Sequence, residues 1–273
     1  MEISAPGPLR ATTAGRVDLA RRLADAASRL SRRFGLGGGG VIGGRVLLAI
    51  APRAVHTLSD GRTVVLVSGT NGKSTTAAMT TAALRSSFAT DTNADGANLP
   101  AGLVQALAEG CAEHVVLETD EGWLPWTVTS TRPSVVVLLN LSRDQLHRHP
   151  EVLPVARSWR SALTEVPLVV ANADDPAVVW AASAARSVTW VSAGRRGLAD
   201  MTACPRCSRR LVGHDVGWGC SCGFARPEAD WWVEGTDLVS AGTRVPLHPS
   251  LPGRVNIANA AMAVATATSL HVT

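Results

Sequence analysis

The sequence predicts an α/β fold in which a mostly parallel sheet lies between layers of helices. Three observations support this: short Val- and Leu-rich runs recur, helical stretches separate them, and a glycine-rich turn follows the first run. Apolar runs without polar alternation are typical of strands buried on both faces. The expected strands span residues 64–67, 115–117, 135–139, 168–170 and 188–191. The expected helices span residues 72–86, 100–109, 151–165, 174–185 and 254–270.

Three segments describe the expected organisation of the chain. Residues 1–60 form an N-terminal helical segment, residues 61–273 a nucleotide-binding domain, and residues 201–227 a Cys-rich insertion within that domain. Residues 16–33 have the pattern of a basic amphipathic helix. Its polar face suits solvent, and the alternative is contact with an anionic membrane surface. The apolar segment 255–272 contains Asn and Thr, which favours a packed helix over a membrane span.

Composition narrows the class of protein. The chain is 46% apolar and 18% charged, with a net charge of +4, so it can form a sizeable core and has too little positive charge for a typical nucleic-acid binder. Lys73 is the single Lys among 26 basic residues. The first apolar run is late and broken by Arg, which argues against a secretory signal. Four of the five Cys form close pairs, which suits a reducing cytosol and a metal.

A phosphate-binding loop is predicted between the first strand and the following helix. The glycines permit close approach of the backbone, and the first amides of the helix can hold phosphate oxygens. Lys73 would reach the β- and γ-phosphates of ATP, and Ser74 would ligate Mg²⁺. Val67 stands where the common motif has its first glycine, so an ordinary glycine-rich turn is the alternative. The loop residues are Gly69, Thr70, Asn71, Gly72, Lys73, Ser74 and Thr75.

Acidic residues follow the second expected strand. Glu118 comes at the carboxyl end of this strand, where open α/β sheets bind ligands. It is the preferred ligand, besides Ser74, of the Mg²⁺ that accompanies ATP. Asp120 fits a helix cap. Asn98 either touches a substrate or closes a turn. Lys73 and Glu118 are therefore the expected catalytic residues.

Two close Cys pairs predict a zinc ribbon in the insertion. Cys204 and Cys207 form a C-P-x-C knuckle, and Cys220 and Cys222 follow as C-x-C, with 12 residues between the two pairs. Four thiolates suit a closed, structural Zn²⁺ site. A redox pair or buried thiols are the alternatives, because the second pair is one residue shorter than usual. Cys111 is expected in a helix, as a core residue.

Four segments, in order, resemble motifs of the Mur ligase family. Residues 69–74 resemble its ATP loop, and residues 140–149 its N-[IL]-x-x-D-H-L-D-R-H segment. Residues 172–176 resemble its N-A-D-D-P turn, and residues 253–260 its G-x-x-N-x-x-N-A helix start. The resemblance implies a Mur-ligase-type central P-loop domain.

Within this family the chain is most similar to the MurT-type subunits of lipid II isoglutaminyl synthases. Gln145 stands where other members carry His, residues 118–121 resemble an L-E-x-D-E block, and the Cys-rich insertion has a matching place. The resemblance implies phosphorylation of the α-carboxylate of D-glutamate on lipid II by ATP and Mg²⁺. Ammonia from a GatD-type glutaminase partner would then form the amide. Such an enzyme would act in the cytoplasm at the inner face of the membrane, with at most peripheral contact with it.

The resemblance also assigns two residues to the adenine side of the ATP site, and it shows two differences between this sequence and the family pattern. Asn256 and Asn259 would lie near the adenine of ATP. Many relatives carboxylate a Lys to bridge a second Mg²⁺, but the corresponding region 157–160 has none, and His147 is a weak substitute. The chain ends at Thr273, directly after the central domain, so the family's C-terminal domain is absent from it. We expect either a fragment or a truncated protein.

Several functions stay open at this stage. The first is the amidating ATPase subunit, and the second is an amino-acid-adding Mur or folylpolyglutamate-type ligase. The third is a zinc-ribbon binding module that uses its P-loop as a switch, and the fourth is a nucleotide-binding remnant without ligase activity. Asp144 and Arg148 could position phosphate or substrate, or form a helix cap and a local ion pair.

Overall fold

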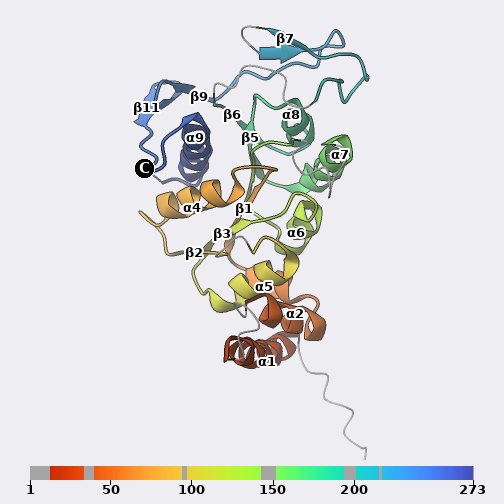
Figure 1. The fold of residues 1–273 in the computed structure, drawn as a ribbon, viewed down its shortest axis with the longest axis vertical. Helices are drawn as coiled ribbons and strands as arrows, with labels where there is room; N and C mark the ends of the chain where they lie inside the picture. Colours follow the sequence, from red (N-terminus) through yellow and green to blue (C-terminus); the bar gives the residue numbers. More distant parts are fainter. Residues whose placement is uncertain are drawn as a thin grey trace, which may run out of the picture.

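The computed structural model describes residues 13–33, 40–93, 97–142, 152–193, 201–214 and 217–272. Within this part of the chain, nine strands form one sheet in the order β11-β10-β9-β6-β5-β4-β1-β3-β2 (Figure 1). The strands from β2 to β9 in this order pair in parallel, and β9, β10 and β11 pair antiparallel. The strands are β1 (Thr63–Ser68), β2 (Thr90–Thr92), β3 (His114–Glu118), β4 (Val135–Leu138), β5 (Leu168–Asn172), β6 (Val188–Ser192), β9 (Trp231–Glu234), β10 (Asp237–Ser240) and β11 (Thr243–Pro246).

Helices cover both faces of this sheet, as the unbroken apolar strands require. Alternate residues of β1 point to opposite sides, so Val65 and Val67 pack with α4 and α9, while Val64 and Leu66 pack with the helices of the other face. Figure 1 shows α4 and α9 on one side and α6, α7 and α8 on the other. The helices are α1 (Thr13–Arg33), α2 (Gly40–Ile50), α3 (Ala54–Ser59), α4 (Lys73–Leu84), α5 (Pro100–Glu109), α6 (Leu124–Thr131), α7 (Val152–Ala162), α8 (Pro176–Ala182) and α9 (Arg254–Ser269). The predicted α/β architecture is confirmed.

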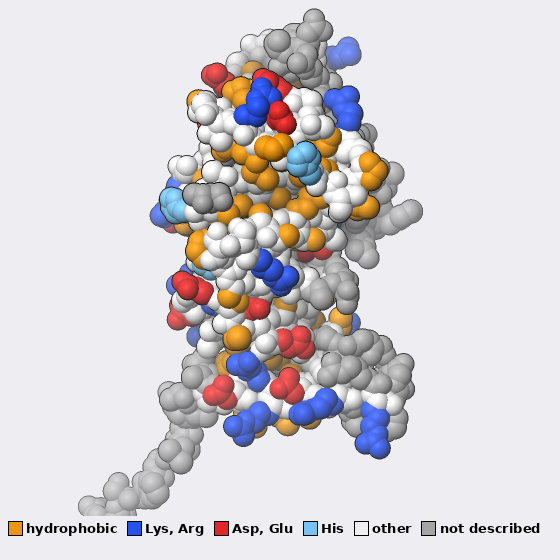
Figure 2. Space-filling model, turned by 90° about the vertical axis from the view of Figure 1, so that its left-hand side faces the viewer, with side chains coloured by type: hydrophobic (Ala, Val, Ile, Leu, Met, Phe, Trp, Pro, Cys, Tyr) orange, Lys and Arg blue, Asp and Glu red, His pale blue; other side chains and the backbone are white. Residues whose placement is uncertain are grey.

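The N-terminal helices extend the core at one end. Helix α1 packs on α2 and α2 on α5, so that Val17 and Leu47 belong to the same apolar cluster as Leu66 of the sheet. Helix α1 lies across the end of the molecule farthest from β7 (Val212–His214), which pairs antiparallel with β8 (Gly217–Gly219) in a separate two-stranded sheet (Figure 1). Figure 2 shows basic and acidic side chains gathered at this end. No described helix is long and apolar enough to cross a membrane.

Several elements have sequences too short or too polar for the patterns used above. Strand β2 has only the residues Thr-Asp-Thr, and each of the three antiparallel strands β9–β11 includes a charged residue. Helix α6 is rich in Thr, which favours helices weakly. The prediction for Cys111 is wrong: it is exposed, in the connection between α5 and β3. Apolar positions on both sides of it fill α5 and β3, and the short link needs no core residue.

Candidate functional site

The carboxyl ends of β1, β3, β4, β5 and β6 meet at one edge of the sheet, because these strands are parallel. Four segments that the sequence singles out follow these ends: 69–72, 118–121, 140–142 and 172–175. Ligands of open α/β sheets bind at such an edge. The fold therefore brings together the predicted phosphate loop, the acidic block, and the two turns that begin at Asn140 and Asn172.

The phosphate loop leads directly into helix α4. Strand β1 ends at Ser68 and α4 begins at Lys73, with Gly72 at the N-cap and no side-chain cap on the first turn. Uncapped amides at a helix N-terminus, together with the helix dipole, favour a bound anion. Ser74 is exposed and Thr75 half-buried at this same end, so both hydroxyls start the helix beside the loop.

Two loop glycines are required by close contacts. A Cβ on Gly69 would lie 2.9 Å from Cβ of Leu139, and one on Gly72 would lie 2.7 Å from Oδ1 of Asn259. Gly72 also has φ +86°, a conformation that side chains disfavour. The loop can therefore pass beside α9 only with glycine at position 72.

We expect Gly72→Ala to weaken nucleotide binding by at least about tenfold, because backbone strain and the clash with Asn259 together cost at least about 1.4 kcal/mol in the binding-competent loop conformation. The measurement is the Kd for ADP by titration calorimetry. Gly235→Ala is the matched control, since Gly235 has φ +64° but open space around its Cβ position. Equal nucleotide affinity in the Gly72 variant and in wild type would contradict the assignment.

Lys73 lies at the centre of the loop and is buried. Its Nζ donates to the carbonyl oxygens of Gly69 (2.6 Å) and Thr70 (3.1 Å), and forms an ion pair of 3.2 Å with Oε2 of Glu121. The carbonyl oxygen of Glu121 accepts from the indole of the fully buried Trp159 (2.8 Å). Glu121 was not singled out from the sequence as a site residue. Its place in the acidic block was the only available signal.

Glu118 ends β3 next to the start of the loop, with its Cα opposite that of Val67. Its carboxylate is buried and accepts from the amide of Asn98 (3.0 Å). The side-chain amide of Asn93 makes two hydrogen bonds with the Glu118 backbone: its Oδ1 accepts from the N–H (2.8 Å) and its Nδ2 donates to the carbonyl oxygen (2.9 Å). Asn98 therefore orients Glu118. Asp120 accepts from the N–H of Gly122 in a local turn that precedes α6.

Asn140 braces the loop from the end of β4. Its Oδ1 accepts from the N–H of Asn71 (3.0 Å), and its Nδ2 donates to the Asn71 carbonyl (2.9 Å). Thr70 adds two backbone contacts, because its N–H donates to the Asn140 carbonyl and its hydroxyl accepts from the N–H of Ser142. These bonds fix the loop to the neighbouring strand end.

Asn140→Asp is expected to weaken nucleotide binding by roughly tenfold. A carboxylate would face the Asn71 carbonyl where an amide now donates, and it would add negative charge beside bound phosphates. The Kd for ADP, measured at two salt concentrations, checks this. Asn256→Asp, which adds the same charge where the amide donates only to the Pro252 carbonyl, is the comparison. Equal weakening in both variants would mean that charge alone is responsible.

The two predicted adenine-side residues differ in their placement. Asn259 is buried and lies against Gly72. Asn256 is half-buried at the start of α9 and donates to the carbonyl of Pro252 (3.2 Å), with no hydrogen bond to the loop among the described residues. The structure thus places Asn259 directly against the loop.

Part of the predicted site lies outside the described residues. This applies to Asp144, Gln145, His147 and Arg148. The first three residues of their segment, 140–142, are described and contact the loop as above.

The turn after β5 connects the site to the Cys-rich insertion. Asp175 caps α8 and also accepts from the N–H of Leu141 (2.9 Å). Asp174 is buried and accepts from Arg226 (2.9 Å), at the end of the insertion, and from Ser192. Asp175 therefore supports the 140–142 segment beside the phosphate loop, and Asp174 holds the Cys-rich insertion.

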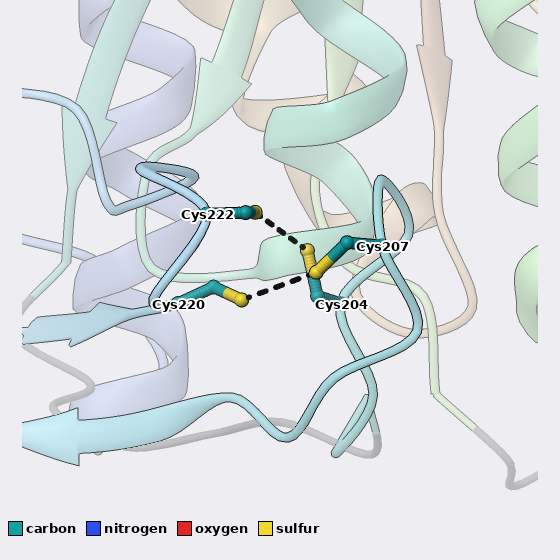
Figure 3. A group of neighbouring side chains, drawn as sticks. All are labelled: Cys204, Cys207, Cys220 and Cys222. Atoms are coloured by element: carbon teal, nitrogen blue, oxygen red, sulfur yellow. Dashed lines mark hydrogen bonds between the residues drawn. The ribbon is translucent and has the colours of Figure 1, made fainter.

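The four predicted cysteines meet in a single cluster (Figure 3). The Sγ atoms of Cys204 and Cys222 are 3.6 Å apart, those of Cys207 and Cys220 are 3.5 Å apart, and all four lie within 4.8 Å of one another. Sulfurs at ~2.3 Å from a tetrahedral Zn²⁺ would be about 3.8 Å apart. The cluster therefore fits a zinc ion without an open position.

Local backbone geometry explains why the short C-x-C pair is sufficient. The N–H of Cys220 donates to the Phe224 carbonyl, and that of Gly223 donates to the Cys220 carbonyl, which curls the segment around the cluster. The backbone N–H of Phe224 lowers the pKa of Cys222 to about 7. A thiolate for metal binding is thus available at neutral pH at this position.

Comparison with known proteins identifies the family. Residues 67–267 match the family described as the Mur ligase middle domain, so the chain belongs to the Mur ligase family. A solved structure of MurF from Acinetobacter baumannii superimposes with a TM-score of 0.63 and 18% identity, covering 84% of this chain and 47% of that one.

Curated relatives include both branches considered above. The lipid II isoglutaminyl synthase (glutamine-hydrolyzing) subunit MurT of Staphylococcus aureus (strain COL) is 27% identical over 80% of this chain and 53% of its own length. The UDP-N-acetylmuramate–L-alanine ligase of Arthrobacter sp. (strain FB24) is 34% identical over 80% of this chain and 42% of its own length. The chain spans about half the length of the curated relatives it matches.

Proposed function

We propose that the chain is the ATP-dependent subunit of a lipid II isoglutaminyl synthase. It would activate the α-carboxylate of D-glutamate in the stem peptide as an acyl phosphate. Ammonia from a GatD-type glutaminase would then form the amide. The observation that carries the proposal is the buried Lys73–Glu121 pair at a phosphate loop that begins beside Glu118.

Nucleotide binding follows from the residues of the loop. The uncapped first turn of α4 presents amides to the phosphates, and Lys73 adds a positive charge. On nucleotide binding, the Lys73 Nζ would exchange Glu121 for phosphate oxygens. Ser74 and Glu118 would hold Mg²⁺, a cation that prefers oxygen ligands and that would neutralise negative charge on the phosphates.

The reaction would need mainly positioning and charge neutralisation. The substrate carboxylate oxygen bonds to the γ-phosphorus as the bond to ADP breaks, and this gives an acyl phosphate. Ammonia then bonds to the acyl carbon, phosphate leaves, and the nitrogen loses a proton. Lys73 and Mg²⁺ would offset the charge that develops on the transferred phosphoryl group.

Three features support amidation over addition of an amino acid. The chain has no Lys besides Lys73, so no carboxylated Lys can bridge a second Mg²⁺. The acidic block 118–121 and the Cys₄ cluster also match the MurT-type pattern. The higher identity to an L-alanine-adding ligase keeps amino-acid addition as the second candidate.

The decisive experiment offers both reactions to the full protein together with its glutaminase partner. Lipid II, ATP, Mg²⁺ and glutamine should yield an amidated stem peptide, detected by mass spectrometry. Free amino acids without glutamine should yield no new peptide bond. Glu118→Gln should retain ADP binding without metal and lose turnover. Peptide-bond formation without amidation would favour the second candidate and overturn the proposal.

A further inference from the structure

The outer face of helix α1 carries an apolar stripe bordered by arginines. Leu19 and Leu23 are 56% and 45% exposed, and they lie one helical turn apart with the exposed Ala26 beside them. The opposite face is fully occupied, because Val17, Ala20 and Ala24 are buried in the core. Two large apolar side chains one turn apart, bordered by basic residues, give this helix the amphipathic outer face that suits binding in the plane of an interface.

Charge is concentrated on the same helix. Helix α1 contains six arginines and two aspartates, a net charge of +4 that equals the net charge of the whole chain. At helical spacing, Arg22, Arg29 and Arg33 follow one edge of the apolar stripe and Arg16 lies at the other edge, and all four are exposed. The exposed Asp18 and Asp25 lie one helical turn before Arg22 and Arg29, on the side of these arginines that faces away from the stripe.

The position of α1 makes this face accessible to a flat surface. The helix lies across one end of the molecule, at the opposite end from β7 (Figure 1), and charged side chains gather at that end (Figure 2). Arg21 points inward and donates to the Ala108 carbonyl, which fixes the helix on α5. Arg16, Arg22, Arg29 and Arg33 are exposed, so they can contact a partner while Arg21 holds the helix in place.

We propose that the outer face of α1, defined by Arg16, Leu19, Arg22, Leu23, Ala26, Arg29 and Arg33, docks on an anionic phospholipid surface. Leucines would enter the boundary between headgroups and acyl chains, and flanking arginines would contact lipid phosphates. Several arginines acting together near an anionic leaflet give measurable binding that weakens as salt is raised. This inference rests on the proposed function in one respect: a lipid-linked substrate explains why such docking is useful.

The test is co-sedimentation of the 273-residue chain with vesicles. Binding is expected to vesicles containing phosphatidylglycerol, to be weak with pure phosphatidylcholine, and to fall as salt is raised. The double variant Leu19→Gln/Arg22→Gln should bind the anionic vesicles roughly tenfold or more weakly. Val212→Gln/Arg210→Gln, an exposed pair on the insertion with the same changes of charge and polarity, should bind like wild type.

Three outcomes overturn the proposal: no binding of wild type to anionic vesicles, equal loss in both double variants, or loss of glutaminase binding in place of lipid binding. The last outcome would assign the face to an acidic protein surface. Amidation of a water-soluble stem peptide separates this proposal from the proposed function. Leu19→Gln/Arg22→Gln should leave it unchanged, and failure of amidation with intact vesicle binding would count only against the proposed function.

Discussion

Lys73→Ala is expected to abolish ATP turnover and to weaken nucleotide binding by at least about a hundredfold, because it removes the only ammonium that can reach the phosphates. The same change should also destabilise the nucleotide-free protein. Glu121 would remain as a buried carboxylate without its 3.2 Å partner, and breaking a buried pair in this way typically costs about 3–5 kcal/mol. Turnover is measured by phosphate release, and stability by chemical denaturation.

A double variant separates these two effects. Lys73→Ala/Glu121→Gln removes both charges, so it should recover much of the lost stability while remaining unable to turn over ATP. Glu121→Gln alone tests whether the carboxylate is needed once phosphate occupies the loop. ATP turnover at wild-type rate by a folded Lys73→Ala protein would refute the phosphate-loop assignment.

Cys204→Ser is expected to reduce bound zinc from about one ion per chain to far less. Three thiolates and a serine hydroxyl make a weak site, because Zn²⁺ in structural sites prefers four S or N ligands. Metal binding and folding are coupled in such sites, so the free energy of unfolding should fall by at least about 2 kcal/mol. Plasma emission spectroscopy on freshly purified, reduced protein gives the zinc content.

Cys111→Ser is the matched control for this change. Cys111 is exposed and lies apart from the Cys cluster, so its variant should keep both zinc and melting temperature. The apolar residues Leu211, Trp218 and Phe224 are buried beside the cluster, within the larger apolar cluster of the sheet. They explain why loss of zinc should lower the stability of the whole fold. Wild-type protein without zinc would refute the structural role.

The parts of the fold that could be predicted are those that a local pattern determines. The strand that contains Val64–Val67 is apolar throughout because both its faces are covered. Such a run can be recognised from its own sequence, without knowledge of the strands that pair with it. Strands β9–β11 were missed because each includes a charged residue, Glu234, Asp237 or Arg244, and so lacks the unbroken apolar run of a buried parallel strand. Strand β2 depends on pairing with β3 and has no apolar run of its own.

The site shows the same division. Lys73, Gly72 and the four cysteines have special chemistry at fixed spacing, and they lie where their motifs indicate. Glu121 could not be distinguished from Asp120 in sequence, because only the tertiary fold decides which carboxylate reaches Lys73. Likewise, Trp159 is 38 residues from Glu121, and nothing local links them.

The contact between Arg226 and Asp174 limits how this protein can be dissected. Asp174 is 5% exposed, and Arg226, its ion-pair partner, closes the segment that carries the zinc cluster. Excising residues 201–227 to obtain a minimal nucleotide-binding core would therefore leave a buried carboxylate beside a turn that supports the phosphate loop. A protein without residues 201–227 should therefore also carry Asp174→Asn. The amide can still form hydrogen bonds with Ser192 and Ala193, and it leaves no unpaired buried charge.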